Sequence, residues 1–345
     1  MNGIKTNEKI IIGRTDLAKD EYEKYQGKQL PDFGNEEFEI KNISVTKNIV
    51  GNQAATILQK QPGNYYTIDL SNCNIHDTKT LEDIEHTLAT VLKDMLEELH
   101  LVGKKAFVVG LGNSNVTPDA IGPYVIDNTI VTRHLYLIDA LSEGFSCVSA
   151  MSPGVMGTTG IETYDIIESM IKKIDVDFVI VVDALATNSI KRINKTIQLT
   201  DTGIKPGSGV GNKRKELSLQ TLGIPVIAIG VPTVVDATTI TVKYLYLESE
   251  NKTSYANKLS PTLVYENLNS VEDMSDIHKE AFLGPFGKLT EEQQRTLIEE
   301  VLTPQGYNLM VTPKEIDVEV EDLSKIIANG INLAVHSGLY NGQSE

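Results

Sequence analysis

The chain has 345 residues, of which 41% are hydrophobic and 23% charged, a composition that is typical of a soluble globular protein and excludes wholesale disorder. Its formal net charge of −16 would repel phosphate backbones, so direct nucleic-acid binding over a broad face is disfavoured and a basic or peptide partner fits better. Cys73 and Cys147 lie outside any Cys-x-x-Cys pair, and no stretch resembles a secretory signal or a membrane span, which indicates a cytoplasmic protein with no disulfide framework, zinc ribbon or membrane partner.

The first part of the chain is weakly patterned. Residues 1 to about 40 are mixed and polar and show no sustained period of either kind, so we expect an extension outside the core. Residues 43–50 and 65–70 have the composition of short strands, with the turn-forming Gln61-Pro62-Gly63-Asn64 between them. These two segments are predicted to pair as a hairpin.

An amphipathic helix follows. Its apolar residues recur at spacings of three and four, at Leu81, Ile84, Leu88, Val91, Leu92, Met95, Leu96 and Leu99. Thr80 and Asp83 have the spacing of a capping box, which places the start of the helix near Leu81.

Strands then alternate with helices. The expected elements are a strand over 105–110, a helix from Pro118 or Asp119, an apolar run over 146–150, a helix over 161–174, a strand over 177–183, and a strand over 225–230 followed by a helix after Ala237. Such alternation favours right-handed crossovers and a mostly parallel sheet covered on both faces. We therefore predict a three-layer αβα domain of the α/β class, with the charged C-terminal third capping the sheet.

Three aspartates follow three of the predicted strands. Asp119 comes shortly after the glycines that close the strand over 105–110, Asp183 ends the apolar run 178–182, and Asp236 lies beyond the strand over 225–230. Ligands of α/β sheets bind at the carboxyl ends of the strands, so these residues are candidates for an active site. The alternative role of Asp119 is a helix cap, and that of Asp183 is a carboxylate bonded to nearby backbone amides.

Two glycine clusters suggest a phosphate-binding loop as an alternative. Gly110-Leu111-Gly112-Asn113 follows a strand but lacks the third glycine and the acidic residue of a dinucleotide fingerprint. The segment 207–215, which contains Gly209 and Gly211 and ends in Lys213, Arg214 and Lys215, lacks the Gly-Lys-Ser/Thr ending of a P-loop. We read both clusters as auxiliary parts of an active cleft, with amides that could stabilise an oxyanion and basic residues that could meet acidic substrate groups.

Other hydrolase classes find little support. The six histidines are scattered and form no His-Glu-x-x-His motif, which excludes a zinc protease of that type. No Gly-x-Ser-x-Gly elbow occurs, and neither cysteine has the glycine-flanked context of a nucleophile.

The chain resembles the germination proteases of endospore-forming bacteria, which degrade small acid-soluble spore proteins when a spore germinates. The resemblance spans nearly the whole chain and rests on the runs 108–123, 131–135, 152–157, 201–215, 223–237 and 308–315. It implies a fold related to that of the hydrogenase-maturation endopeptidases. It also implies small acid-soluble spore proteins as substrates, a location in the spore core, and a homo-oligomer, expected to be a tetramer.

The resemblance places the catalytic aspartates at Asp119 and Asp183. The hydrogenase-maturation relatives hold a metal with a glutamate, an aspartate and a histidine, but Ala120 follows Asp119 here, so that glutamate is missing. We therefore expect no metal and no cofactor, and a mechanism in which the two carboxylates share a proton. A metal-dependent peptidase of the same fold, using Asp236 beside Asp183, is the alternative.

The N-terminal segment acquires a role from the same resemblance. The family prefers an acidic residue before the cut, a hydrophobic residue after it and then alanine, and Asp16-Leu17-Ala18 has this pattern, although Gly13 departs from the acidic residue preferred further upstream. We predict a propeptide over residues 1–16, cleavage between Asp16 and Leu17, and a single catalytic domain over residues 17–345. The alternative is that Arg14-Thr15-Asp16 caps a helix.

Overall fold

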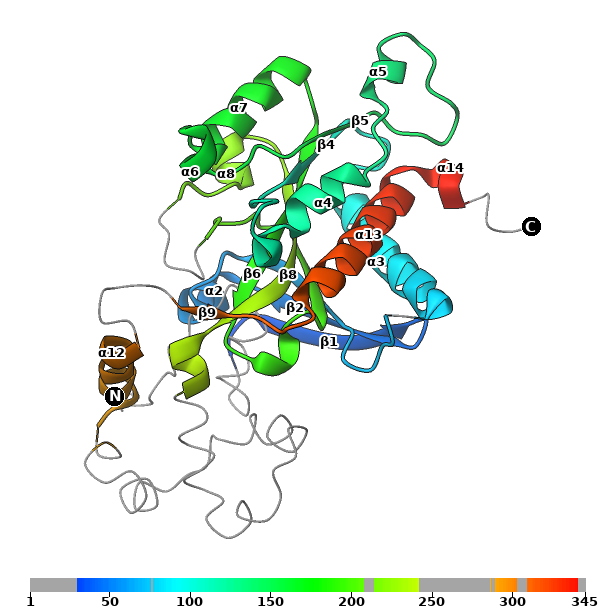
Figure 1. Cartoon of the computed structure of the whole chain (residues 1–345). Helices are drawn as coiled ribbons and strands as arrows, with labels where there is room; N and C mark the ends of the chain where they lie inside the picture. The colour runs from blue at the N-terminus through cyan, green and yellow to red at the C-terminus, as the bar shows by residue number, and fades with distance from the viewer. Residues whose placement is uncertain are drawn as a thin grey trace, which may run out of the picture.

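The computed structural model describes residues 30–75, 77–207, 214–241, 286, 289–302 and 309–340. The strands within them form one mixed sheet in the order β1-β2-β3-β7-β8-β6-β4-β5, and β9 pairs with β8 (Figure 1). The strands are β1 Phe33–Ile40, β2 Ile43–Val50, β3 Gly63–Asp69, β4 Ala106–Gly110, β5 Val148–Met151, β6 Phe178–Thr187, β7 Thr196–Thr200, β8 Val226–Asp236 and β9 Met310–Val311.

Helices cover both faces of the sheet, which confirms the predicted three-layer α/β architecture (Figure 1). On one face α3 (Thr78–Glu98) packs against α13 (Ile316–Val335), which also contacts α4 (Ile121–Asp127). On the other face lies α7 (Thr163–Ile174). The remaining helices are short or peripheral: α2 Asn52–Leu58, η1 Thr117–Asp119, α5 Arg133–Tyr136, α6 Met156–Thr159, η2 Ile190–Arg192, α8 Leu219–Leu222, α12 Glu291–Leu302 and α14 Ser337–Tyr340.

The alternation of side chains along β6 assigns each residue to one of the two cores. Ile180 and Val182 belong to the larger cluster, which includes the apolar faces of α3 and α13. Val179 and Val181 belong to the second cluster, with Ile167 of α7. Because successive side chains of a strand point to opposite faces, Asp183 continues the second series and faces the α7 side.

The sheet is mixed, so the prediction of a mostly parallel sheet holds for only one half of it. Strands β5, β4, β6 and β8 run parallel, whereas β1-β2-β3-β7 and the β7–β8 and β8–β9 pairs are antiparallel. The predicted hairpin of residues 43–50 and 65–70 is present as β2–β3, and α2 occupies its connection. The parallel half carries the loops that build the site described below.

The expectation that residues up to about 40 lie outside the core was wrong for residues 33–40. They form β1, which pairs with β2 along its whole length through a turn at Lys41 and Asn42, both at positive φ. This strand lies at the edge of the sheet and most of its side chains are exposed, so it needs no apolar alternation and leaves little periodic signal.

Three boundaries also differ from the prediction. The N-cap of α3 is Asp77, whose carboxylate accepts a hydrogen bond from the Thr80 N–H, so the predicted box of Thr80 and Asp83 is not the cap. Pro118 and Asp119 lie in a single 3-10 turn, and α4 begins only at Ile121. Strands β6 and β8 run well past the predicted ends, with consequences for the placement of two aspartates.

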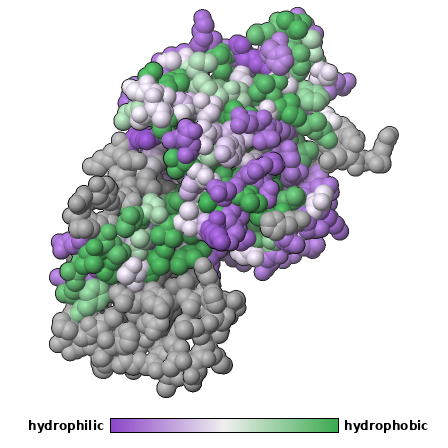
Figure 2. Space-filling model, viewed as in Figure 1, coloured by the Kyte–Doolittle hydropathy of each residue, from purple (hydrophilic) through white to green (hydrophobic). Residues whose placement is uncertain are grey.

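The surface carries apolar side chains at two places on the face seen in Figure 2. One group lies over β9 and α12 and includes Leu297, Val301 and Val311. The other lies around α5, where Leu137 and Ile138 are exposed. Among the described residues, no helix combines the length and apolarity that a membrane crossing needs.

Candidate active site

Asp119 and Asp183 line the same cavity, which has a volume of about 540 Å³. Its walls come from parts of the chain that are distant in sequence. They are the loop after β4, the segment with Gly154, Val155 and Thr163, the middle of β6, the segments around Pro206 and Arg214, and the β8–β9 region with Thr233, Leu309, Met310 and Thr312. Most of the remaining lining is apolar, as is usual for a binding pocket with a few polar groups.

The loop after β4 folds back on itself so that Asp119 returns to the sheet. The Leu111 N–H donates a 2.8 Å hydrogen bond to the Val182 carbonyl, which extends the parallel ladder by one residue. The Asn113 N–H then donates to the Asp119 carbonyl at 2.9 Å and closes the loop. Gly112 lies between them at φ 111, and a Cβ there would lie 2.0 Å from the Asp119 carbonyl oxygen, so only glycine fits.

Two further contacts fix the segment that carries Asp119. Gly110 and Gly122 allow α4 to approach β4 closely, since a Cβ on Gly110 would lie 2.1 Å from the Gly122 carbonyl oxygen. The Thr233 hydroxyl donates a 2.6 Å hydrogen bond to the Pro118 carbonyl, and the Thr312 hydroxyl donates to the Thr233 carbonyl at 2.9 Å. Strand β8 and the chain after β9 therefore position the residue before Asp119.

Asp183 lies within β6 and not at its end. It pairs in register with Gly230 of β8, and the strand continues for four more residues to Thr187. Its side chain is only 6% exposed, and its Oδ1 accepts a 2.9 Å hydrogen bond from the Ala184 N–H. Asp183 lines the cavity, but the prediction that it ends its strand was wrong: the face of the sheet presents the carboxylate, beside the loop after β4.

Burial raises the pKa of Asp119 to about 6, and the hydrogen bond from Asn113 and the charge of Arg214 oppose this shift. Arg214 lines the cavity. The neighbouring Lys215 is held outside the cavity by a 3.0 Å ion pair with Asp165 and by a cation–π contact with Tyr164, in which Nζ lies 4.8 Å from the ring centroid. A raised pKa keeps Asp119 partly protonated near neutral pH, which a general acid requires.

Asp236 is not part of this site, so the predicted grouping of three carboxylates is wrong. Strand β8 continues to Asp236, six residues beyond the Gly230 that pairs with Asp183, which corresponds to roughly 20 Å along a strand. Asp236 instead forms an ion pair with Arg295 and accepts hydrogen bonds from the Thr238 N–H and the Thr239 hydroxyl. Its role is to tie the end of β8 to α12.

The donor set of the cavity fits a metal poorly. Its described lining contains two carboxylates and no histidine, cysteine or glutamate, and no cluster of three such ligands occurs elsewhere in the described residues. Divalent metals in peptidase sites are held by three protein ligands. The Asp183–Asp236 pairing of the metal-dependent alternative is not provided by this fold.

The loop after β4 also lacks the geometry of a phosphate site. The N–H groups of Leu111, Asn113 and Asn115 donate to Val182, Asp119 and the Asn113 side chain, respectively, so they are not aimed at a common anion. The element that follows is a three-residue 3-10 turn. A phosphate loop instead presents several amides at the start of a longer helix.

The other predicted site residues have different outcomes. Gly112 lines the cavity, whereas Asn113 stabilises the loop through its backbone N–H and its side chain. Gly209, Gly211, Asp16 and Leu17 lie outside the described residues. Thr233 and Leu185 were not predicted, because a threonine or leucine inside an apolar strand carries no signal until the neighbouring strands are known.

Comparison with known proteins shows the family to which this chain belongs. The sequence profile described as germination protease matches residues 11–345. Germination proteases of Bacillus cereus (strain ATCC 10987 / NRS 248) and Bacillus mycoides (strain KBAB4) are each 46% identical to this chain and cover 94% of it and 93% of their own length. The identity extends over 342 and 343 residues, respectively.

Among solved structures, a [NiFe] hydrogenase maturation protease HycI from Thermococcus kodakarensis KOD1 aligns with 41% of this chain and 80% of its own. The TM-score is 0.26 and the identity 18%.

Proposed function

This chain belongs to the germination protease family and is an endopeptidase, and from that premise we propose that it initiates the degradation of small acid-soluble spore proteins during germination. The observation that carries the proposal at the level of chemistry is the joint placement of Asp119 and Asp183 in one cavity. In this proposal the enzyme acts in the spore core, where its substrates are stored.

We propose that the two carboxylates act together on the scissile peptide bond. Like charges close together do not both ionise readily, so the pair shares one proton and titrates as a unit. The raised pKa of Asp119 favours this residue as the protonated member, which protonates the leaving amine. Asp183 then takes a proton from the attacking water.

Gly112 supplies a donor for the developing oxyanion. It lines the cavity beside Asp119, and within the described residues its N–H makes no hydrogen bond. A backbone amide fixed by its loop stabilises negative charge without reorganisation during the reaction. Arg214, in the same wall, would attract the acidic residue that the family prefers before the cut.

The enzyme is made as a zymogen in this proposal. Residues 1–16 are the propeptide, residues 17–345 are the single catalytic domain, and cleavage between Asp16 and Leu17 gives a mature chain that begins Leu17-Ala18-Lys19. Substituting Asp16→Lys should stall maturation, because a pocket that selects an acidic side chain would meet a cation. N-terminal sequencing of the matured protein tests this step, and a start far from Leu17 would contradict it.

We also propose a homo-oligomer, with a tetramer as the expected state. The support is the exposed apolar segment around α5, which includes Val131, Tyr136, Leu137 and Ile138 and forms one of the apolar areas in Figure 2. Contiguous exposed apolar side chains of this kind are typical of protein interfaces. Light scattering of the wild type and of Leu137→Glu tests it, with a smaller mass expected for the variant.

The experiment that tests the function is incubation of the purified protein with a small acid-soluble spore protein, followed by mass spectrometry of the products. We expect cleavage at a small number of positions preceded by an acidic residue, and the same rate with and without a chelator. Loss of activity on chelation and recovery with a divalent ion would establish the metal-dependent alternative. Stabilisation by phosphate without any cleavage would favour the phosphate-binding alternative.

A further inference from the structure

A second cavity, of about 570 Å³, lies next to the active site on the same face of the sheet. Leu185 lines both cavities, and no other residue of their described linings is shared. Leu185 lies directly over Gly230, where a Cβ would be only 2.3 Å from the leucine Cδ1. The two cavities are thus adjoining parts of one surface.

The register of the sheet aligns the two cavities. Gly230 pairs with Asp183 on one side and with Gln198 of β7 on the other, so the three residues form a row across adjacent strands. Ile197 and Leu199 belong to the core on the opposite face, so Gln198 and Asp183 point to the same side. The Cα atoms of Gln198 and Asp183 are two strand spacings apart, which is roughly 10 Å.

Gln198 carries a buried donor that has no acceptor within the described residues. Its side chain is 9% exposed and lines the second cavity, and none of the residues that the structure describes accepts a hydrogen bond from its Nε2. The neighbouring hydroxyls satisfy one another, since Thr200 contacts Thr202 at 3.0 Å, Thr202 donates to Tyr65 and Tyr65 donates to the Gln61 carbonyl. Buried amides are nearly always paired, so the unpaired nitrogen in a cavity wall points to a ligand with an oxygen acceptor.

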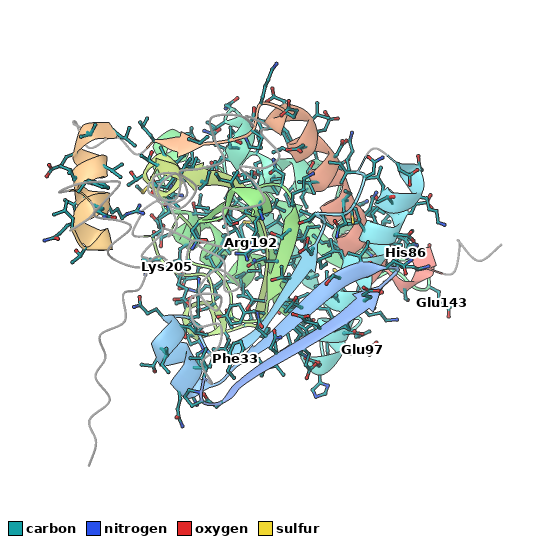
Figure 3. All side chains as sticks on the ribbon, turned by 90° about the horizontal axis from the view of Figure 1, so that it is seen from below. Phe33, His86, Glu97, Glu143, Arg192 and Lys205 are labelled. Carbon is teal, nitrogen blue, oxygen red and sulfur yellow. The ribbon has the colours of Figure 1, made fainter. Side chains whose placement is uncertain are left out.

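We propose that this second cavity is a remote subsite for the polypeptide substrate, in which Gln198 donates to an oxygen of a residue about three positions from the scissile bond. The proposal rests on the proposed function of the first cavity. An extended chain advances about 3.3–3.6 Å per residue, so three residues cover the distance from Asp183 to Gln198. The rim carries Lys205, which lies on the α2 side of the molecule, away from His86 and Glu143 (Figure 3).

The test compares three peptides with the same cleavage site: one short peptide, and two that extend by four residues on one side or the other. In the wild type, one of the two extended peptides should have a higher kcat/KM than the short peptide. In Gln198→Leu this advantage over the short peptide should shrink roughly three- to tenfold, the value of one hydrogen bond, through KM and not kcat. Gln198→Glu, which replaces the donor with an acceptor, should show the same loss, whereas Gln220→Leu on the exposed face of α8 should not.

Binding gives a readout independent of turnover. In the Asp119→Asn background, the affinity for the favoured extended peptide, measured by fluorescence anisotropy, should fall by the same factor in Gln198→Leu. Thermal unfolding verifies that each variant is folded. Equal losses on short and extended peptides, or no advantage of either extended peptide in the wild type, would overturn the proposal. Failure of the wild type to cleave any of the three would instead refute the proposed function.

Discussion

The hydroxyl of Thr233 donates a 2.6 Å hydrogen bond to the carbonyl of Pro118, so strand β8 holds the residue directly before Asp119. The carbonyl of Thr233 in turn accepts a hydrogen bond from Thr312, close to β9. The position of the first aspartate therefore depends on Thr233, which lies 115 positions from Pro118 in sequence, and on the C-terminal segment that covers the sheet.

Removing this hydrogen bond should reduce catalysis more than stability. Thr233→Val keeps the volume of the side chain but cannot donate, so we expect kcat to fall by roughly tenfold or more through misplacement of Asp119. The loss of unfolding free energy should be about 1 kcal/mol. Thr233→Ser, which retains the hydroxyl, should recover most of the rate. A normal kcat in Thr233→Val would show that the contact does not position the carboxylate.

Gly112→Ala should inactivate the enzyme. The new methyl group would lie 2.0 Å from the Asp119 carbonyl oxygen, and residue 112 has φ 111, so the loop must shift. Gly157→Ala is a matched control, since a Cβ there meets nothing within 4 Å. Peptide cleavage by the two variants is compared at equal folded fraction, and an active Gly112→Ala enzyme would contradict the proposed loop geometry.

Asp119→Asn should stabilise the fold at neutral pH. The pKa of Asp119 rises from 3.8 to about 6 on folding, so the folded state binds the proton more tightly and loses stability as pH rises through this window. Above pH 6 this ionisation lowers the free energy of unfolding by roughly 3 kcal/mol. Asparagine does not ionise, so the variant avoids this loss. Denaturant unfolding should therefore give a gain for Asp119→Asn at pH 7.5 that disappears near pH 4. An equal difference at both pH values would exclude ionisation as its cause.

Arg214→Gln should move the pH dependence of the rate. The charge of Arg214 lowers the pKa of Asp119, so its removal should raise that pKa. Because Asp119 acts as the general acid, the alkaline limb of the kcat/KM profile should shift to higher pH. Arg214→Lys keeps the charge and should shift the limb less. Lys215→Gln is the control, since that ammonium is paired with Asp165. A limb that stays in place in Arg214→Gln would remove Arg214 from the electrostatics of the site.

The sequence predicted the class of the fold and most strands, because the apolar runs of β4, β6 and β8 and the 3.6-residue period of α3 are strong local signals. The edge strand β1 was missed because its exposed residues have no buried face to produce alternation. The end of β6 was misplaced because a buried aspartate within a strand resembles a strand terminus until its partners are known.

The site was predicted in part for the same reason. Asp119 and Asp183 follow conspicuous apolar or glycine-rich runs, so sequence pattern and family resemblance both identified them. The exclusion of Asp236 depends on strand register and length, and the contact of Thr233 with Pro118 depends on how β8 lies against the loop after β4. Gln198 gave no signal, because a single glutamine in a short strand acquires meaning only from the cavity beside it.

Asp119 and Asp183 are proposed to act as one catalytic unit. The most direct test of this proposal is the single-turnover rate of peptide cleavage by Asp119→Asn, Asp183→Asn and the double variant, with Asp175→Asn as an exposed control. We expect each single variant to lose nearly all activity, the double variant to be no slower than either, and the control to be unaffected. Near-normal cleavage by Asp119→Asn or by Asp183→Asn, in a folded protein, would contradict it.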